Sequence, residues 1–293
     1  MKFYTVLCTG KEVTATAGKN GCLYSLKALG VQAETMNALI ENWQNLCGQI
    51  KDGIEKVNAD PDAYADKALT DYKILAPIPE PKQDVVCLGV NYHDHKKEAA
   101  AGIDFVKTAD TIYFAKRVNR ANDPEGLIPN YNFVDSLDYE AELGVIIGKD
   151  AFHVTPEEAG AYIFGYTVIN DVSARNVQKR HQQWYLGKSL DGYTPMGPCI
   201  VTADEIGDPH ALDIRCYVNG ELRQNSNTKY MITTVEEAIS ELSQGMTLQC
   251  GTIIATGTPA GVAMGMNPPV WLKSGDKVCC EIEKIGVLEN FVE

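Results

Sequence analysis

Short strand-like segments follow one another along most of the chain beyond residue 81. They read DVVCLGV, AELGVIIG, FGYTVIN, DIRCYVNG, TIIATG and KVCCEIE, and each is bounded by Gly, Pro or Asp. Helical patterns are fewer there. The best covers residues 235–242, directly after Thr233 and Thr234, which are residue types that start helices. This part of the chain is therefore expected to be α+β and mostly β.

A proline-rich stretch, LAPIPEP at residues 75–81, separates this region from a different N-terminal part. Its three prolines exclude a helix and favour an extended connector. Before it, residues 2–7 alternate as a strand does, and residues 34–53 carry apolar side chains at helical spacing. We therefore expect two domains, a small N-terminal α/β module at residues 1–74 and a main domain at residues 75–293.

Composition limits the partners of this chain. Hydrophobic residues make up 45% and charged residues 22% of the 293 residues, as in ordinary globular proteins. A net charge of −13 without a cluster of Lys and Arg disfavours nucleic acid. No apolar run is long enough to span a bilayer, the N-terminus lacks the pattern of a signal peptide, and the nine cysteines form no C-x-x-C pair. We expect a cytoplasmic protein that binds neither nucleic acid nor membrane.

Two glutamates one residue apart, Glu140 and Glu142 in DYEAELGVIIG, indicate a metal site. On a strand both project from the same face, whereas on a helix they would point roughly 200° apart. Ionised carboxylates beside an apolar core strand need a compensating cation. The strand FGYTVIN then delivers Asp171 at its C-terminal end. Three oxygen ligands favour Mg²⁺, Mn²⁺ or Ca²⁺ over zinc, and the alternative is a solvated strand face.

Asp171, Arg175 and Gln178 follow one another at i, i+4 and i+7 and share one face if DVSARNVQ opens a helix. Arg175 could then hold a substrate carboxylate in bidentate geometry, and Gln178 could donate to a keto oxygen. The alternative is a surface helix with a routine ion pair between Asp171 and Arg175.

A second polar group lies in GVNYHDHKKEA, where His95 and Glu98 stand at i, i+3 of a predicted helix. A histidine oriented by a carboxylate can act as a general base, although an exposed helix start would show the same pattern. His93 points to another side of this helix. Further along, Lys188 in a loop rich in Gly and Pro could neutralise an enolate, or be solvated. The amides of residues 256–262 could cradle an anion, or form an ordinary turn.

Together these segments resemble the fumarylacetoacetate hydrolase family. The motifs, in family order over residues 75–293, are LGVNYHDHKKE, LDYEAELGVIIGKD, FGYTVINDVSARNVQ, GKSLDGYTPMGPCIVTADEI, YVNGELRQ, TGTPAGV and LKSGDKVCCEIEKIGVLEN. The resemblance implies a mixed β-sandwich roll, usually a homodimer. It implies one divalent ion, Mg²⁺ or Mn²⁺ with Ca²⁺ also possible, at Glu140, Glu142 and Asp171. It also implies substrate contacts from Arg175, Gln178, Lys188 and Thr258, and a water-activating pair, His95 and Glu98, on a mobile lid. Two departures, Asn176 and Thr252, could shift substrate preference.

The reaction that the resemblance implies is hydrolysis of a carbon–carbon bond in a 2,4-diketo acid of the acylpyruvate or fumarylpyruvate type, with release of pyruvate or a related 2-keto acid. His95 and Glu98 would activate water, and Lys188 would stabilise the enolate that leaves. The same enolate arises when oxaloacetate loses CO₂ or when a hydroxydienoate isomerises, so a decarboxylase or isomerase is the alternative. The His95–Glu98 pair favours hydrolysis. A third hypothesis, a non-catalytic binding protein, leaves that pair unexplained.

Overall fold

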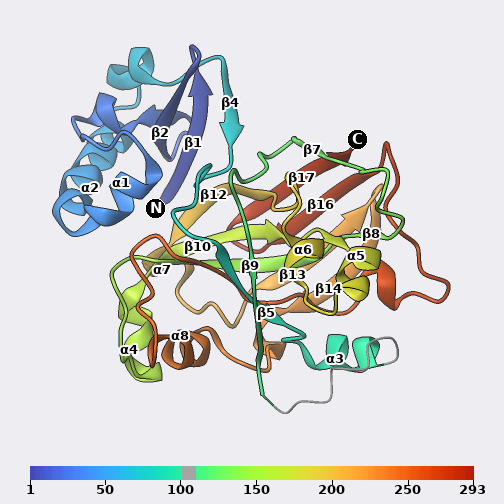
Figure 1. Cartoon of the computed structure of the whole chain (residues 1–293). Helices are drawn as coiled ribbons and strands as arrows, with labels where there is room; N and C mark the ends of the chain where they lie inside the picture. Colours follow the sequence, from blue (N-terminus) through green and yellow to red (C-terminus); the bar gives the residue numbers. More distant parts are fainter. Residues whose placement is uncertain (101–109) are drawn as a thin grey trace.

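The computed structural model describes residues 1–100 and 110–293, and the side chains of residues 99 and 100 are not described. Its main body is two β-sheets packed face to face, and helices and long connections surround them (Figure 1). The strand segments expected from the sequence all appear in these sheets. The predicted class, α+β and mostly β with a sandwich roll, is confirmed.

The large sheet runs, in spatial order, through β3 (Leu23–Ser25), β2 (Lys11–Ala17), β1 (Lys2–Cys8), β12 (Met196–Thr202), β10 (Ile163–Asn170), β9 (Ala141–Ile147), β15 (Ile253–Ala255), β5 (Val85–Gly89) and β6 (Ile112–Lys116), and β4 (Tyr72–Leu75) pairs with β1. The second sheet contains β14 (Glu221–Asn227), β13 (Asp213–Val218), β16 (Lys277–Ile282), β17 (Gly286–Val292) and β7 (Leu127–Ile128). A short ladder joins β8 (Leu137–Asp138) to β11 (Ser173–Ala174).

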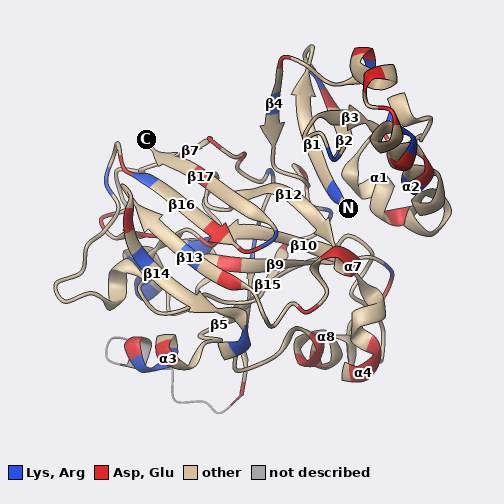
Figure 2. Cartoon of the chain, turned by 180° about the vertical axis from the view of Figure 1, so that it is seen from behind, with Lys and Arg blue, Asp and Glu red and all other residues tan. Residues whose placement is uncertain are grey.

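The helices are α1 (Met36–Glu41), α2 (Trp43–Ala59), α3 (His93–Ala100), α4 (Pro156–Ala159), α5 (Arg175–Arg180), α6 (Tyr185–Lys188), α7 (Ala203–Ile206) and α8 (Val235–Ser243), with 3-10 turns η1 (Leu26–Leu29), η2 (Asp62–Lys67), η3 (Gly160–Tyr162), η4 (Thr228–Tyr230) and η5 (Ala263–Gly265). Helix α8 begins where the sequence predicts, because Thr234 and Glu237 form a capping box. Acidic residues lie on the outer helices α2, α4 and α8 (Figure 2). Among the described residues, no helix combines the length and apolar character needed to cross a membrane.

The period-two alternation of β9 divides its side chains between two cores. Leu143 and Val145 belong to the core between the two sheets, whereas Ile146 belongs to the core on the other face of the large sheet. Glu140 and Glu142 have the same parity as Ile146, so they lie on this second face. The large sheet therefore presents carboxylates on the face away from the second sheet, next to an apolar core.

The N-terminal residues extend the large sheet rather than forming a sheet of their own. Strand β1 pairs with β2 and β4 on its way through the N-terminal part, and with β12 from the main part. The helix expected over residues 34–53 is two helices, α1 and α2, which meet at Asn42. The division into residues 1–74 and 75–293 stays a prediction.

Candidate active site

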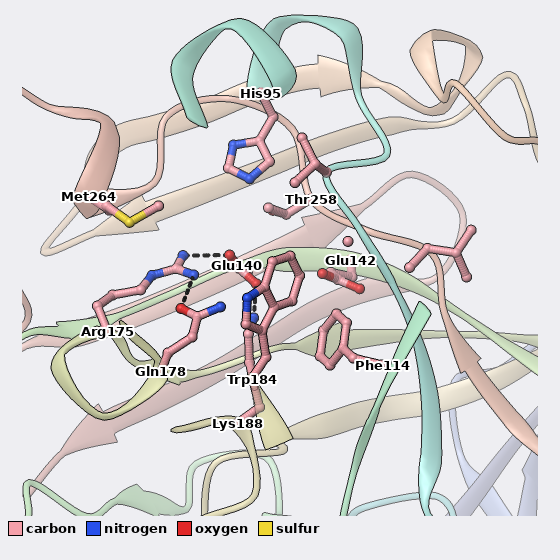
Figure 3. A pocket seen from close by; sticks show the side chains of 13 residues that line it. His95, Phe114, Glu140, Glu142, Arg175, Gln178, Trp184, Lys188, Thr258 and Met264 are labelled. Atoms are coloured by element: carbon pink, nitrogen blue, oxygen red, sulfur yellow. Dashed lines mark hydrogen bonds and ion pairs between the residues drawn. The ribbon is translucent and has the colours of Figure 1, made fainter. Parts of the chain in front are cut away.

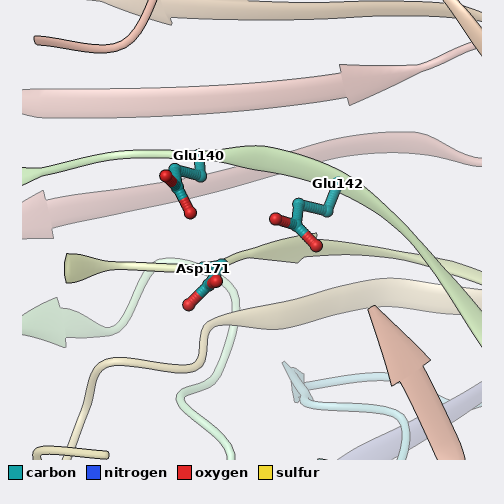
Figure 4. A group of neighbouring side chains, drawn as sticks. All are labelled: Glu140, Glu142 and Asp171. Atoms are coloured by element: carbon teal, nitrogen blue, oxygen red, sulfur yellow. The ribbon is translucent and has the colours of Figure 1, made fainter. Parts of the chain in front are cut away.

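The three carboxylates predicted to hold a metal converge in the structure. Glu140 directly precedes β9, Glu142 lies within it, and Asp171 follows β10, the antiparallel neighbour of β9. The amide of Asp171 donates to the carbonyl of Glu140 at 2.9 Å, which fixes the two strand ends together. All three side chains are buried, and one oxygen of each lies within 4.8 Å of the others (Figure 4).

Buried cations surround two of these carboxylates. Lys188 Nζ donates to Glu140 Oε2 at 2.5 Å and to Asp171 Oδ2 at 2.6 Å, and Lys116 forms an ion pair with Asp171. Arg175 donates to Glu140 at 2.5 Å. Burial alone would raise the pKa of Glu140, but Arg175 and Lys188 bring this pKa below its ordinary value. The carboxylate of Glu140 is therefore held in the ionised form.

Glu142 differs, because its carboxylate accepts a hydrogen bond from the backbone amide of Gly257 at 2.9 Å. Burial, together with the nearby charges of Asp171 and Glu140, raises the pKa of Glu142 well above its ordinary value. A divalent cation among the three carboxylates would compensate this charge. The donor set, three carboxylates and no thiol, fits a hard cation of the Mg²⁺ or Mn²⁺ kind.

The helix that carries Arg175 begins later than its sequence spacing suggests. Helix α5 starts at Arg175 itself, so Asp171 lies outside it, and the expectation of one continuous helical face is wrong. Pairing of β11 with β8 brings Arg175 back to the site instead. Its guanidinium donates to Asp138 Oδ2 at 2.8 Å and to Gln178 Oε1 at 3.2 Å, so the alternative of a pair with Asp171 is also wrong.

Lys188 and Thr258 occupy positions that differ from expectation in detail. Lys188 is the last residue of the short helix α6 and not part of a loop, and its ammonium is buried between carboxylates. The hydroxyl of Thr258 donates to the carbonyl of Ala141 at 2.9 Å, so it anchors β9 while the residue also lines the cavity. The amides of residues 256–262 hold protein carboxylates, since those of Gly257 and Gly261 donate to Glu142 and Glu98.

His95 and Glu98 form the pair that the sequence suggests. They lie on α3, where His95 Nδ1 is 2.9 Å from Glu98 Oε2. His95 is 4% exposed and lines the cavity, whereas His93 is exposed, so the reading of α3 as a merely solvated helix start is wrong for His95. Because the partner of Nδ1 is a carboxylate, the proton is assigned to Nδ1, and Nε2 is left as the acceptor.

A small cavity of about 20 Å³ joins these groups (Figure 3). Its lining includes His95, Glu140, Glu142, Arg175, Gln178, Lys188 and Thr258, together with the apolar residues Leu88, Val90, Phe114, Trp184 and Met264. Phe114 and Trp184 meet edge to face at 5.1 Å and form its aromatic wall. Asn176 and Thr252, the two departures from the family pattern, do not line it; their side chains donate to Phe133 and Gln83.

Sequence reasoning missed Lys116, Asp138, Phe114 and Trp184. Asp138 had a local signal, because it precedes Glu140 by two residues in DYEAE and so continues the alternating acidic pattern. Lys116 had none, because it lies 55 residues from its partner Asp171.

A sandwich roll with a buried three-carboxylate centre, a carboxylate-oriented histidine and a buried arginine defines an enzyme with a divalent-metal site. Residues 84–293 match the family described as fumarylacetoacetate (FAA) hydrolase C-terminal, and the chain belongs to this family. The family resemblance seen in the sequence is therefore confirmed. Members of the family bind divalent metals, in agreement with the buried carboxylates.

Individual relatives have different activities in their names. The chain is 43% identical over 224 residues to an oxaloacetate tautomerase of Bacillus subtilis (strain 168), which covers 76% of this chain and 74% of the relative. The solved structure of a fumarylacetoacetate hydrolase from Exiguobacterium antarcticum matches with a TM-score of 0.83 and 38% identity, over 100% of this chain and 99% of that one. A maleylpyruvate hydrolase from Sphingobium sp. SYK-6, in complex with manganese (II) and pyruvate, matches with a TM-score of 0.76 and 26% identity, over 100% and 98%.

Proposed function

We propose that this enzyme interconverts the enol and keto forms of oxaloacetate or a closely related small 2-keto diacid. The tautomerase of Bacillus subtilis, at 43% identity, supports this assignment. The sequence analysis gave as its alternative the decarboxylation of oxaloacetate or the isomerisation of a hydroxydienoate, and tautomerisation shares the enolate of both. The relatives support this alternative better than the hydrolysis of a 2,4-diketo acid. Hydrolysis is the second candidate, because two of the solved relatives are hydrolases by name and because the His95–Glu98 pair could also activate water.

The observation that carries the proposal is that His95 lines the same small cavity as the carboxylates of Glu140 and Glu142 (Figure 3). Ketonisation of an enol removes the proton of the C2 hydroxyl and adds a proton at C3, so no other reactant is consumed. Glu98 binds Nδ1 of His95, so Nε2 is left to exchange one proton with substrate. Hydrolysis would in addition require room for a positioned water molecule.

Arg175 and Gln178 are the groups suited to a substrate carboxylate. Both line the cavity and are buried, and Asp138 fixes the guanidinium so that its remaining N–H donors keep one orientation. The aromatic wall of Phe114 and Trp184 closes the cavity beside them.

Glu140, Glu142 and Asp171 would hold the divalent ion, and we propose Mg²⁺ or Mn²⁺, with Ca²⁺ as a weaker candidate. When bound, such an ion polarises a substrate oxygen and thereby favours the enolate form. Lys188 donates to the carboxylates of both Glu140 and Asp171 and so holds them toward a common point. The carboxylate oxygens that would bind the ion are therefore in position before substrate binds.

The test follows the ultraviolet absorbance of freshly dissolved enol-oxaloacetate with purified protein, Mg²⁺ and a coupling dehydrogenase that accepts only the keto form. The expected result is a faster loss of enol absorbance that matches keto formation and stops when EDTA is added. A parallel assay offers acetylpyruvate and measures pyruvate. Pyruvate release from acetylpyruvate without acceleration of oxaloacetate ketonisation would replace the proposal with the hydrolase.

We further propose that the protein is a homodimer and acts in the cytoplasm, as the sequence analysis expects. Sedimentation equilibrium measures the first, and fractionation of the native cell measures the second.

A further inference from the structure

One short segment, the turn Gly261–Gly265 with η5 at its end, contacts both halves of the site. On one side the amide of Gly261 donates to Glu98 Oε1 at 3.1 Å. On the other side the amides of Ala263 and Met264 donate to the carboxylate of Asp138 at 2.7 and 3.2 Å. The hydroxyl of Tyr139 donates to the carbonyl of Gly261 at 2.9 Å and anchors the turn to the residue next to Glu140.

Gly265 lies directly against the carboxyl group of Glu98. A Cβ built on Gly265 would stand 1.9 Å from Glu98 Oε1 and 2.0 Å from its Cδ, which is closer than atoms can approach. Gly265 is itself exposed, and the backbone there is not in the left-handed region, so the fold places no demand for glycine at this position. Glycine is needed at position 265 because a side chain there would overlap the carboxyl group of Glu98.

Asp138 is the second contact of the turn and is completely buried. Its Oδ2 accepts from Arg175 Nε at 2.8 Å as well as from the amide of Met264. Four donors thus converge on this carboxylate, two of them from the turn, one from Arg175 and one from the amide of Tyr139 at 2.9 Å. The position of the Arg175 guanidinium therefore depends on the turn.

We propose that the turn Gly261–Gly265 is a positioning element that sets the proton-transfer pair and the carboxylate-binding arginine relative to each other. Gly265 positions Glu98, and through it His95, by leaving space for the Glu98 carboxyl group. Asp138 positions Arg175. The inference rests on the proposed function, because it assigns His95 to proton transfer and Arg175 to the substrate carboxylate.

Two variants separate these roles. Gly265→Ala pushes the flexible end of Glu98 aside, and we expect kcat for ketonisation to fall about 10²-fold, as for a misplaced catalytic group, while KM changes little. Asp138→Asn places an amide N–H₂ where Arg175 and Met264 donate, and we expect the affinity for oxalate, an enolate analogue with two carboxylates, to fall about tenfold or more in calorimetry with Mg²⁺. Gly160→Ala is the control, because Gly160 is also an exposed glycine of a 3-10 turn and its added Cβ meets nothing within 4 Å.

A readout independent of turnover is amide hydrogen exchange of residues 93–98, which Gly265→Ala should accelerate and Gly160→Ala should not. Equal kcat and exchange in Gly265→Ala and Gly160→Ala would overturn the inference. So would the same loss of kcat and of oxalate affinity in Gly265→Ala and Asp138→Asn, because that indicates general disorder of the site. If Asp138→Asn does not fold, the comparison of the two glycine variants decides. Exchange and oxalate affinity keep their meaning even if ketonisation is absent, so failure of the proposed function is seen separately.

Discussion

Lys116 and Asp171 form an ion pair in which both side chains are 0% exposed. The ammonium also donates to the carbonyls of Val172 at 3.1 Å and Tyr193 at 2.8 Å, so all three of its protons have acceptors. Lys116 lies at the end of β6, at the edge of the large sheet, and Asp171 follows β10. The pair thus ties the metal-site carboxylate to an element far away in the sequence.

Replacement of Lys116 by Met should destabilise the protein strongly. The variant leaves two buried carbonyls without this donor and removes one of the cations beside Asp171, and loss of one partner of a buried pair costs about 3–5 kcal/mol. Urea unfolding followed by circular dichroism measures the free energy of unfolding. Lys277→Met is the control, because its pair with Glu289 is partly exposed and should contribute little. Equal losses in the two variants would contradict a special role for the buried pair.

Divalent cations should stabilise the folded protein. The nearby charges of Asp171 and Glu140 and burial both disfavour an ionised Glu142. An ion that binds only the folded state should therefore raise the free energy of unfolding by about 2.7 kcal/mol at 100 times its dissociation constant. Thermal unfolding at increasing Mg²⁺ or Mn²⁺, with ionic strength held constant, measures the effect. Glu142→Gln should remove most of the rise in Tm. Retention of the full rise in that variant would place the ion elsewhere.

His95→Ala should lower kcat for ketonisation by about 10²- to 10⁴-fold, the usual contribution of a positioned acid or base. The affinity for oxalate with Mg²⁺ should remain near that of the unmodified protein, because Arg175 and the three carboxylates are unchanged. His93→Ala, on the exposed side of the same helix, should leave both quantities unaltered. Stopped-flow absorbance of the enol and calorimetry give the two readouts. A His95→Ala protein with full kcat would remove His95 from the mechanism.

Stability should depend on pH through His210 and Glu236, which are 2.7 Å apart. The hydrogen bond to Glu236, helped by the charges of Asp208 and Glu237, raises the pKa of His210 above its ordinary value of 6.5. The stability that protonated His210 contributes is complete below pH 6.5 and is lost as the pH rises through the raised pKa. The same bond lowers the pKa of Glu236 below 4.5, so its contribution is present above pH 4.5 and is lost as the pH falls through the lowered pKa.

The pair should therefore stabilise the protein most between pH 4.5 and 6.5. Its contribution should stay below about 1 kcal/mol, because both side chains are partly exposed and water screens the charges. The free energy of unfolding of His210→Gln, subtracted from that of the parent at a series of pH values, gives the profile. A difference that grows above pH 6.5 would have the wrong sign and refute the assignment.

The carboxylate triad could be predicted because its geometry is mostly local. A strand period of two places Glu140 and Glu142 on one face whatever the surrounding fold, and antiparallel pairing of β9 with β10 then brings the strand end at Asp171 beside them. The His95–Glu98 pair is local too, since i and i+3 are neighbours on any helix. The prediction of one helix over residues 34–53 was wrong in one respect, because the apolar period gave no sign of the break at Asn42 between α1 and α2.

The electrostatic environment of the site could not be predicted in the same way. Asp138 reaches Arg175 across 37 residues, and the ring of Trp184 lies 2.4 Å from where a Cβ on Gly89 would be, so each pair is brought together only by the packed sheets. No period or motif in one segment encodes a contact of that kind. Lys188 shows the difference, because its sequence suggested a loop and left open whether its ammonium is catalytic or solvated. Its burial between two carboxylates depends on the approach of α6 to β9 and β10.

The sequence by itself determined the strands and helices and the groups of polar residues along them, because side-chain periodicity and turn chemistry act within a few residues. Tertiary structure alone decided which of these groups face one cavity, which charges surround each carboxylate, and which glycine makes room for Glu98. Those properties depend on burial and on charges that come together from distant segments, and both exist only once the sheets have packed.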